Sequence, residues 1–511
     1  MEAASLPRGV AGPLQAVAEA ARTRSRVFWI VAGLTVGAAA LRFATLGVQS
    51  YHHDEIVTAS RLLRGSFAHA MDAVGFSEST PPLYYALAWF WTQMTGTGEW
   101  GLRSLSALAG VLTVPVAYLL GAELRGRRAG LWAAALVAVN PMLLWYSQEA
   151  RAYSLLVLFG ALSLLWCIRS ARSGRRRDLV WWGVFSGLAL ATHYFAVFPL
   201  VAELLLLLRR RGRGALVGIG VLAAFALALA PLAFHQMSIG HAEWIGQYGL
   251  GHRLAESAGT FVTGETADII GEAERPELSL VPLALFVAAF ALLLWRGGRD
   301  ERRAAFLPFA VGTAAIAVPV AVALVSTSKD YVLARNLIPA LVPLLVVAAI
   351  AFSLPAARRT GAALGGALLV YSLGFCLAAS ALPSLQRPDW DAVAAKLGEP
   401  SGPRAMVTWT LGEASLRHYL STGSFQVRAS EGYPWHVHEV DFISDGEVPP
   451  PGPEVLGPRF RERGAYSAGR LFVRRYSLPG PSLARVRLRK LRGPDLRFRT
   501  TGVLMDGVGP S

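Results

Sequence analysis

Residues 209–234 read RRRGRGALVGIGVLAAFALALAPLAF, a cluster of arginines followed by a long apolar run that carries no charge. A bilayer core needs about 20 apolar residues per helix, so this stretch predicts a membrane-spanning helix that starts at a charged turn. The same arrangement recurs along the chain and predicts eleven spans: 27–47, 104–121, 129–146, 152–168, 179–193, 194–208, 215–235, 279–295, 304–325, 337–354 and 361–382.

The composition agrees with a membrane protein. Of the 511 residues, 53% are hydrophobic and 16% are charged, whereas a soluble domain carries about 25% charged residues. Cys167 and Cys376 both lie in apolar runs, which excludes a disulfide framework. There is no Walker lysine loop, no G-x-G-x-x-G after a strand and no H-E-x-x-H, so nucleotide-driven chemistry lacks its usual signals.

The net charge of +15 marks topology and not nucleic-acid binding. Arginines gather in short turns between the predicted spans, and positively charged loops stay in the cytoplasm. With the N-terminus inside, every cluster falls on the cytoplasmic side, and the loops 48–103, 147–151, 236–278 and 326–336 fall outside. The clusters lie at 125–128, 169–177, 209–213, 296–303 and 358–359.

Three regions follow from this topology. Residues 1–26 form a cytoplasmic segment that precedes a retained first helix, and residues 27–382 form the membrane domain. The run at 83–94, LYYALAWFWTQM, is too short to span and predicts an interfacial helix. Residues 383–511 lie outside the membrane. Alternating, strand-like runs at 405–409, 425–429, 439–443 and 470–477 and one helical stretch at 412–420 predict a small soluble α/β domain without a recognisable catalytic motif.

The first outer loop opens with Tyr51-His52-His53-Asp54-Glu55. A carboxylate at this position can take the proton from an acceptor hydroxyl as that hydroxyl attacks a sugar. The structural alternative is a solvated helix start, because Asp and Glu favour a first turn. The same loop continues with Thr80-Pro81-Pro82-Leu83-Tyr84-Tyr85, and we expect Tyr84 and Tyr85 to line the substrate cavity.

Further candidates stand at the outer ends of later spans. Glu149, Arg151 and Tyr153 lie together at a membrane edge. We expect Glu149 to join Asp54 in the cavity and Arg151 and Tyr153 to bind the donor phosphate. The alternative is a local Glu149–Arg151 ion pair with Tyr153 as an interfacial anchor. His193 falls at an outer turn, where an ionisable residue predicts a site and a hydrogen-bonded cap is the alternative.

The loop before the tenth span holds two further basic residues. Lys329 and Arg335 suit a lipid phosphate, and headgroup binding by a snorkelling side chain is the alternative.

In order and placement, five motifs resemble those of the GT-C membrane glycosyltransferases of the family 39 type, in the branch of protein O-mannosyltransferases and lipid A aminoarabinose transferases. The motifs are HHDE at 52–55, TPPLYY at 80–85, SQEARAY at 147–153, THYF at 192–195 and ARNLIPALVPL at 334–344. The chain departs from the pattern at Thr80, where many members have His or Lys, so a phosphate or metal contact from that position is in doubt.

The resemblance implies a GT-C fold in the plasma (inner) membrane of a bacterium. It implies inverting transfer from a polyprenyl-phosphate sugar to a hydroxyl on a glycan, lipid or protein. Asp54 matches the catalytic base, Glu55 its acidic neighbour and Glu149 the second-loop acid, while His193 and Arg335 match positions near the donor phosphate. No cofactor is certain, although His52, His53 and Glu55 could ligate a divalent metal. A transporter or flippase of lipid-linked sugars is the competing hypothesis.

Overall fold

The computed structural model describes residues 8–240, 245–265, 277–326, 330–409, 411–420, 424–428, 434–445, 456–487 and 501–506. The chain divides into two compact units. The first unit comprises Met1–Ala44, Val74–Tyr84 and Ser104–Cys376, and the second comprises Thr45–Ala73, Tyr85–Arg103 and Leu377–Ser511. Most of the first outer loop therefore belongs to the same unit as the C-terminal tail.

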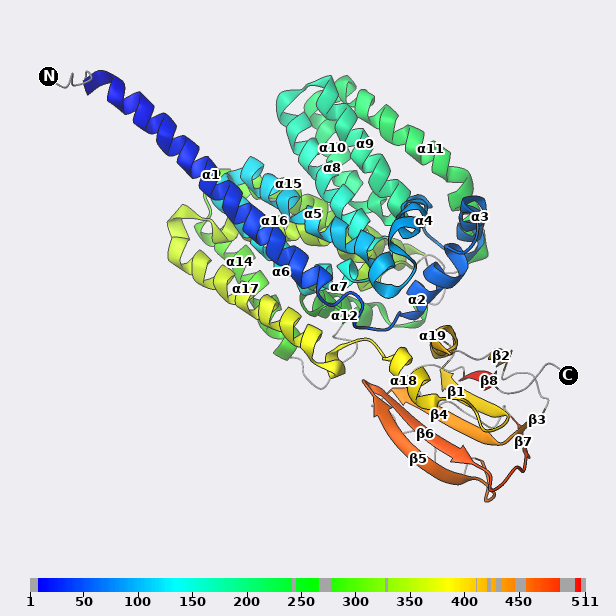
Figure 1. The fold of residues 1–511 in the computed structure, drawn as a ribbon. Coiled ribbons are helices and arrows are strands. Elements are labelled where there is room, and N and C mark those ends of the chain that lie inside the picture. Colours follow the sequence, from blue (N-terminus) through cyan, green and yellow to red (C-terminus); the bar gives the residue numbers. More distant parts are fainter. Residues whose placement is uncertain are drawn as a thin grey trace, which may run out of the picture. The chain divides into compact units, whose positions relative to one another are not determined.

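Helices make up the first unit (Figure 1), although the unit boundaries assign the first residues of α5 and the last residues of α17 to the second unit. Their bounds are α1 Arg8–Phe43, α5 Glu99–Arg125, α6 Arg127–Val139, α7 Pro141–Ser147, α8 Tyr153–Ser173, α9 Arg176–Thr192, α10 Val197–Arg211, α11 Leu216–Ile239, α12 Leu250–Thr263, α14 Glu277–Arg296, α15 Arg299–Val325, α16 Leu341–Phe352 and α17 Arg358–Ala381. Short helices in the first outer loop are α2 His53–Ile56, α3 Phe67–Ser77 and α4 Leu83–Thr95, and a π-helical stretch, Val57–Leu62, continues α2.

The predicted class, an α-helical membrane protein with a small C-terminal α/β region, is confirmed. Among the described residues, eight helical segments are long and apolar enough to cross a membrane, or nine if α6 and α7, bent by 56°, form one span. One segment, Tyr194–Ile239, contains both α10 and α11, and α9 has 17 residues. Helices therefore stand at all eleven predicted places, while the count of eleven crossings stays a prediction.

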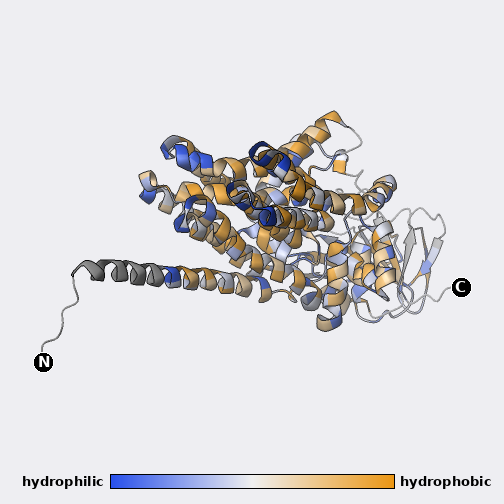
Figure 2. Cartoon of the chain, turned by 90° about the horizontal axis from the view of Figure 1, so that it is seen from above, coloured by the Kyte–Doolittle hydropathy of each residue, from blue (hydrophilic) through white to orange (hydrophobic). Residues whose placement is uncertain are grey.

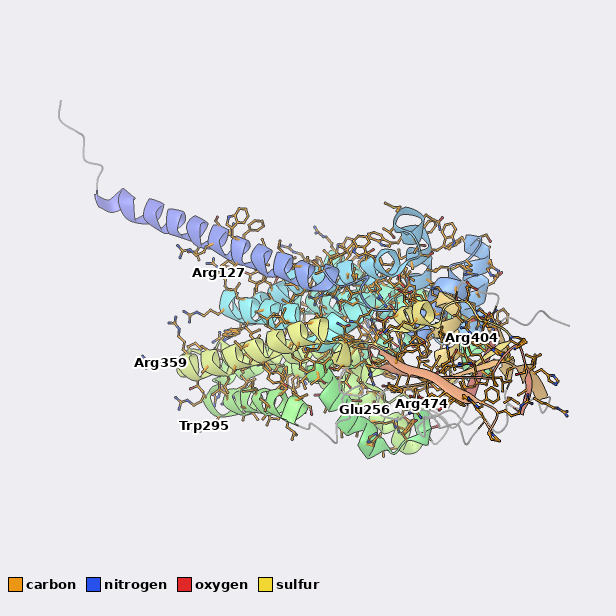
Figure 3. All side chains as sticks on the ribbon, turned by 60° about the horizontal axis from the view of Figure 1, so that its bottom comes forward. Arg127, Glu256, Trp295, Arg359, Arg404 and Arg474 are labelled. Atoms are coloured by element: carbon orange, nitrogen blue, oxygen red, sulfur yellow. The ribbon has the colours of Figure 1, made fainter. Side chains whose placement is uncertain are left out.

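The arginine-rich turns meet at one end of the helical unit. Side chains join each of them to another: Arg169 Nε to Glu123 Oε1 at 3.0 Å, Arg211 Nε to the Ser170 carbonyl at 3.0 Å, Arg296 Nη2 to the Ala356 carbonyl at 3.2 Å, and Arg125 to Glu301. Figure 3 labels Arg127 and Arg359 at this end, and in Figure 2 hydrophilic segments occupy the helix ends while apolar residues dominate their length. This shared end is what the charge pattern predicts for loops on one side of a membrane.

Glycines let α9 and α11 approach each other closely. A Cβ added at Gly183 would lie 2.5 Å from the Gly218 carbonyl oxygen, and one at Gly218 would lie 2.6 Å from that of Leu179. Small residues are the usual means of close helix packing in membranes, because lipid supplies no hydrophobic drive between helices.

Three boundaries differ from those predicted from hydropathy. Helix α1 begins at Arg8, well before the apolar run, because alanine-rich sequence favours helix without needing lipid. Helix α5 begins at Glu99 and carries Arg103 inside its first turns. The outer loop 236–278 contains α12. This helix has a polar face, so its sequence contains no continuous apolar run.

The tail in the second unit forms a six-stranded sheet in the order β2-β8-β1-β4-β6-β5 and a separate pair β3-β7. Within the six-stranded sheet β1 and β4 are parallel, with Ala405 opposite Val440. The other neighbouring pairs are antiparallel. Helices α18 Trp390–Leu397 and α19 Gly412–Tyr419 pack on one face against Met406 and Ile443. The strands are β1 Arg404–Trp409, β2 Phe425–Arg428, β3 Pro434–Val437, β4 Glu439–Asp445, β5 Arg461–Ala468, β6 Leu471–Ser477, β7 Ala484–Arg487 and β8 Thr501–Asp506.

Candidate functional site

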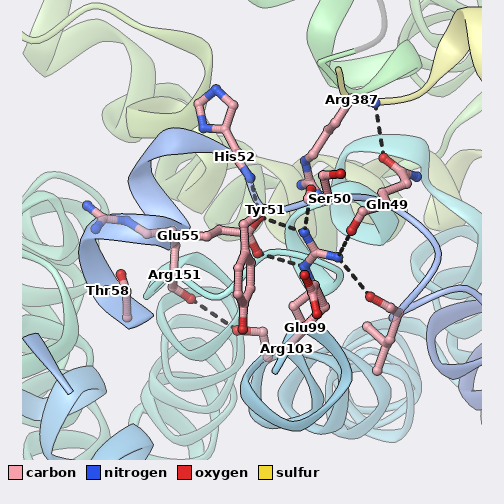
Figure 4. A network of polar contacts seen from close by, with 12 residues as sticks. Gln49, Ser50, Tyr51, His52, Glu55, Thr58, Glu99, Arg103, Arg151 and Arg387 are labelled. Carbon is pink, nitrogen blue, oxygen red and sulfur yellow. Dashed lines mark hydrogen bonds and ion pairs between the residues drawn. The ribbon is translucent and has the colours of Figure 1, made fainter. Parts of the chain in front are cut away.

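The acidic pair of the first outer loop separates into two different environments. The Glu55 side chain is fully buried, and both of its oxygens pair with Arg103, Oε1 with Nε and Oε2 with Nη2, each at 2.7 Å (Figure 4). Glu55 Oε2 also accepts the backbone N–H of His52 at 2.9 Å, which closes the first turn of α2. Two-pronged charge-assisted hydrogen bonds fix geometry tightly, so Glu55 holds the loop in place.

Arg103 gathers the backbone of the loop as well. Its Nη1 donates to the carbonyls of Leu46 at 2.8 Å and Gln49 at 2.7 Å, and its Nη2 donates to that of Ser50 at 3.0 Å. The guanidinium also lies 5.2 Å from the centre of the Tyr51 ring. A single buried side chain thus fixes residues 46–55.

Asp54, in contrast, keeps about a fifth of its side chain exposed and has His53 Nε2 at 2.9 Å from its Oδ1. His53 Nδ1 in turn lies 3.1 Å from His52 Nε2. Burial, and then the charge of His53, lower the pKa of His52 to about 3, so its imidazole is neutral at physiological pH.

His52, His53 and Asp54 could together hold a metal ion, because one ligand atom from each lies within 4.8 Å of the others. Two imidazole nitrogens and a carboxylate oxygen suit a divalent cation such as Zn²⁺. The carboxylate that completes this group is that of Asp54, whereas Glu55, proposed from the sequence, is bound to Arg103.

A second group of candidates lies in the helical unit, at the turns opposite the arginine-rich end. Arg151 pairs with Glu78 through two hydrogen bonds, Nη1 to Oε1 at 3.0 Å and Nη2 to Oε2 at 2.8 Å. Arg151 and Arg335 both act electrostatically on His193, whose ring lies 5.7 Å from that of Tyr153. The structure thus brings Arg151, Tyr153, His193 and Arg335 into one neighbourhood.

Tyr146 belongs to the same neighbourhood. Its ring lies 4.7 Å from that of Tyr153, and its hydroxyl donates to Glu265. The charges of Glu149 and Arg335 also act on the Tyr146 hydroxyl, which places the second-loop acid in this group.

The loop before Arg335 is tied down from α12. Arg253, which is nearly fully buried, donates to Asp330 Oδ1 at 2.7 Å and Oδ2 at 2.5 Å, and to the Val332 carbonyl at 2.8 Å. Burial acts to raise the pKa of Asp330, but the hydrogen bonds from Arg253 and from the Val332 N–H outweigh it and hold the pKa below its usual value. Lys329, the other predicted phosphate ligand, lies outside the described residues.

Other sequence candidates are enclosed by protein. Tyr84 and Tyr85 are both fully buried, and His193 accepts the backbone N–H of Phe195 at 3.3 Å, as the cap alternative predicts.

Sequence reasoning missed Arg103, Glu78, Glu265 and Arg253. Of these, Arg103 left a signal, a lone arginine at the start of an apolar run. The ion-pair partners of the others are distant in sequence, and no local pattern marks them.

A family model described as dolichyl-phosphate-mannose-protein mannosyltransferase matches residues 79–236. The chain is similar to ArnT from Cupriavidus metallidurans in the apo state, with 15% identity, coverage of 88% of this chain and 98% of that chain, and a TM-score of 0.50.

The chain has the GT-C fold. The likeness to ArnT, which covers both units, carries this assignment, and the resemblance predicted from the five motifs is confirmed.

Two further solved structures are similar to this GT-C chain. One is the same ArnT bound to undecaprenyl phosphate, with 14% identity, 87% and 97% coverage and a TM-score of 0.49. The other is the Pmt1–Pmt2 protein O-mannosyltransferase complex of S. cerevisiae bound to the sugar donor, with 20% identity, 41% and 33% coverage and a TM-score of 0.34. No curated protein sequence matches the chain.

Proposed function

We propose that this GT-C protein is a membrane glycosyltransferase that moves a sugar from a polyprenyl-phosphate donor to a hydroxyl of a glycan, lipid or protein, with inversion. The observation that carries the proposal is that Asp54 and Glu55, although adjacent, lie in different environments. Arg103 engages both oxygens of buried Glu55, while Asp54 stays partly exposed beside it. A general base must lie within hydrogen-bond reach of the proton that it takes, and a partly exposed carboxylate can be reached by an acceptor hydroxyl.

The second support is the group of cationic and aromatic side chains in the helical unit. Arg335 and Arg151, which Glu78 engages through two hydrogen bonds, lie near the imidazole of His193. Arginine matches the geometry and charge of a phosphate, so this neighbourhood suits one. The matching family is described as dolichyl-phosphate-mannose-protein mannosyltransferase, and the similar ArnT was solved bound to undecaprenyl phosphate. A lipid-linked sugar phosphate is the donor that fits both observations.

In the proposed reaction Asp54 takes the proton from the acceptor hydroxyl as its oxygen attacks the anomeric carbon. The bond between that carbon and the phosphate oxygen breaks, and polyprenyl phosphate leaves with the bonding electron pair. The cationic group stabilises the negative charge that builds on the departing phosphate. A single displacement of this kind inverts the anomeric configuration.

We place the reaction on the outer face of the membrane. The positive-inside rule assigns the end with the arginine-rich turns to the cytoplasm. Tyr153 begins α8 and His193 follows α9, at the opposite ends of these helices from that arginine-rich end. The proposed site therefore faces outward.

The test uses purified protein in sealed lipid vesicles with labelled polyprenyl-phosphate sugars and a hydroxyl acceptor, and it measures release of polyprenyl phosphate. Asp54→Asn keeps the shape of the side chain and removes the proton acceptor, so turnover falls by about 10²–10⁴-fold while donor binding survives. Asp72→Asn, at an exposed carboxylate in the same loop, is the matched control and keeps the wild-type rate.

Wild-type turnover by Asp54→Asn would remove the assignment of the base. Movement of the labelled lipid across the bilayer without release of polyprenyl phosphate would favour the transporter hypothesis. The proton magnetic resonance spectrum of the product distinguishes an inverted from a retained anomeric centre.

A further inference from the structure

The residues before Asp54 are held by the C-terminal region as well as by α5. The Tyr51 backbone N–H donates to the hydroxyl oxygen of Tyr419, which ends α19, at 2.7 Å. Ser50 Oγ donates to Asp389 Oδ1 at 3.1 Å and accepts the backbone N–H of Asp391 at 3.0 Å. These contacts join segments more than 330 residues apart within one compact unit.

A further contact lies beside them. The Arg387 backbone N–H donates to Gln49 Oε1 at 3.1 Å, and Figure 4 shows this contact next to the Arg103 network. Residues 49–51 are thus hydrogen-bonded to residues 387–391 and to Tyr419. All of these partners are C-terminal to the last predicted span.

The Tyr419 hydroxyl does two things at once. It accepts from the Tyr51 N–H and donates to Glu99 Oε1 at 2.6 Å. Burial, and then the hydrogen bond to Glu99, raise the pKa of Tyr419 well above its usual value, so the hydroxyl keeps its proton and can donate to Glu99 at physiological pH. The ring of His418 packs edge-on against Tyr51, with centroids 5.6 Å apart.

The loop has little regular structure of its own before α2, so its backbone groups need partners from elsewhere. Arg103 supplies donors to carbonyls of this loop, and Tyr419 supplies the acceptor for the Tyr51 N–H. Tyr51 is only three residues from Asp54. A change in the path of the chain at Tyr51 therefore shifts the carboxylate.

We propose that the C-terminal domain is a positioning element of the reaction centre, and that Tyr419 and Asp389 fix the loop that carries Asp54. This inference rests on the proposed function of Asp54. The C-terminal domain, in which the sequence shows no recognisable catalytic motif, then contributes to the reaction by positioning. Misplacement of a reacting group by about 1 Å can cost about 10²-fold in rate, so the loss of such a contact is measurable in turnover.

The experiment compares Tyr419→Phe with Tyr466→Phe in the full-length protein. Tyr466 is a partly buried tyrosine of the same domain, and no hydrogen bond of its hydroxyl is found among the described residues, so its variant is the matched control. We expect Tyr419→Phe to lower kcat by about 10–10²-fold. The donor KM should stay within about twofold, because the proposed phosphate-binding residues are not on this loop. Tyr466→Phe should behave as wild type.

Hydrogen–deuterium exchange of peptides that cover residues 49–55 gives a readout that does not depend on activity. The Tyr51 amide should exchange faster in Tyr419→Phe than in wild type. In Tyr466→Phe its exchange rate should equal that of wild type. If Tyr419→Phe does not fold, Ser50→Ala, which removes the hydroxyl between Asp389 and Asp391, replaces it. The same fall in kcat is expected, and the Asp391 amide, which loses its acceptor, should exchange faster than in wild type.

The outcomes separate the two proposals. If the single variant Asp54→Asn is inactive but Tyr419→Phe has the wild-type kcat, the positioning role is overturned and the proposed function stands. An equal loss of kcat and donor affinity also overturns it, because that pattern reports general damage. If Asp54→Asn turns over at the wild-type rate, the assignment of Asp54 as the base fails, and the exchange measurement still decides whether Tyr419 orders the loop.

Discussion

Replacing Arg103 with methionine should be among the most damaging single changes in the second unit. Methionine keeps much of the length and apolar volume of the side chain but removes every donor. Both Arg103 and its partner Glu55 are almost completely buried. Removing one member of a buried ion pair costs about 3–5 kcal/mol, because the remaining charge has no compensation.

The backbone adds to this cost. Arg103 also donates to three loop carbonyls, and each buried carbonyl left without a partner costs about 1–3 kcal/mol. The terms overlap, so we expect a total of at least about 3 kcal/mol. Glu55→Gln should cost less, about 1–3 kcal/mol, because Arg103 keeps its three carbonyls.

A double-mutant cycle isolates the pair. Glu55→Leu combined with Arg103→Met removes both charges, so the double variant should be less destabilised than the sum of the single variants. The assay is unfolding of the purified protein in mixed micelles of mild detergent and dodecyl sulfate, with Arg169→Met as a surface control. Arg169 pairs with Glu123, and both side chains are about a third exposed, so its loss should cost at most about 1 kcal/mol.

The reasoning is refuted if Arg103→Met is no less stable than Arg169→Met. It is also refuted if the two changes at Glu55 and Arg103 are simply additive, because a buried pair must show coupling.

Three other expectations can be tested directly. Cysteines introduced at Arg176 and at Glu399, both exposed, should react with impermeant reagents from opposite sides of the membrane, and reaction from one side would contradict the predicted topology. Arg335→Ala should weaken donor binding by about 1.5–3 kcal/mol in a calorimetric titration, and an unchanged affinity would leave Arg335 as a headgroup contact. Gly218→Ala should destabilise by about 1–3 kcal/mol, because its Cβ would meet the backbone of α9, whereas Gly220→Ala on the same helix meets nothing within 4 Å and should be tolerated.

The sequence was sufficient for the membrane class because a bilayer imposes a length and an apolar composition on each span. The arginine clusters predicted turns that share one end, and contacts such as Arg169–Glu123 agree with it. The alternating runs of the tail predicted β1, β2, β4 and β6, and the stretch at 412–420 predicted α19. Helix α12 escaped detection because a short amphipathic helix in a loop has neither the length nor the apolar character of a span.

The candidate residues were also found from local motifs, since a carboxylate pair or an arginine at a membrane edge is visible in the sequence. Their roles were not. That Glu55 is buried against Arg103 while Asp54 stays open depends on residues 48 positions apart. That Tyr51 depends on Tyr419 involves a separation of 368 positions.

The sequence by itself determined which segments are apolar enough for lipid, which turns carry positive charge and which polar residues stand at the span ends. Only the tertiary structure decided which of those polar residues pair with each other and that the tail joins the first outer loop. The physical reason is that hydropathy and charge are properties of a local segment, whereas burial and ion pairing depend on which distant segments the fold brings into contact.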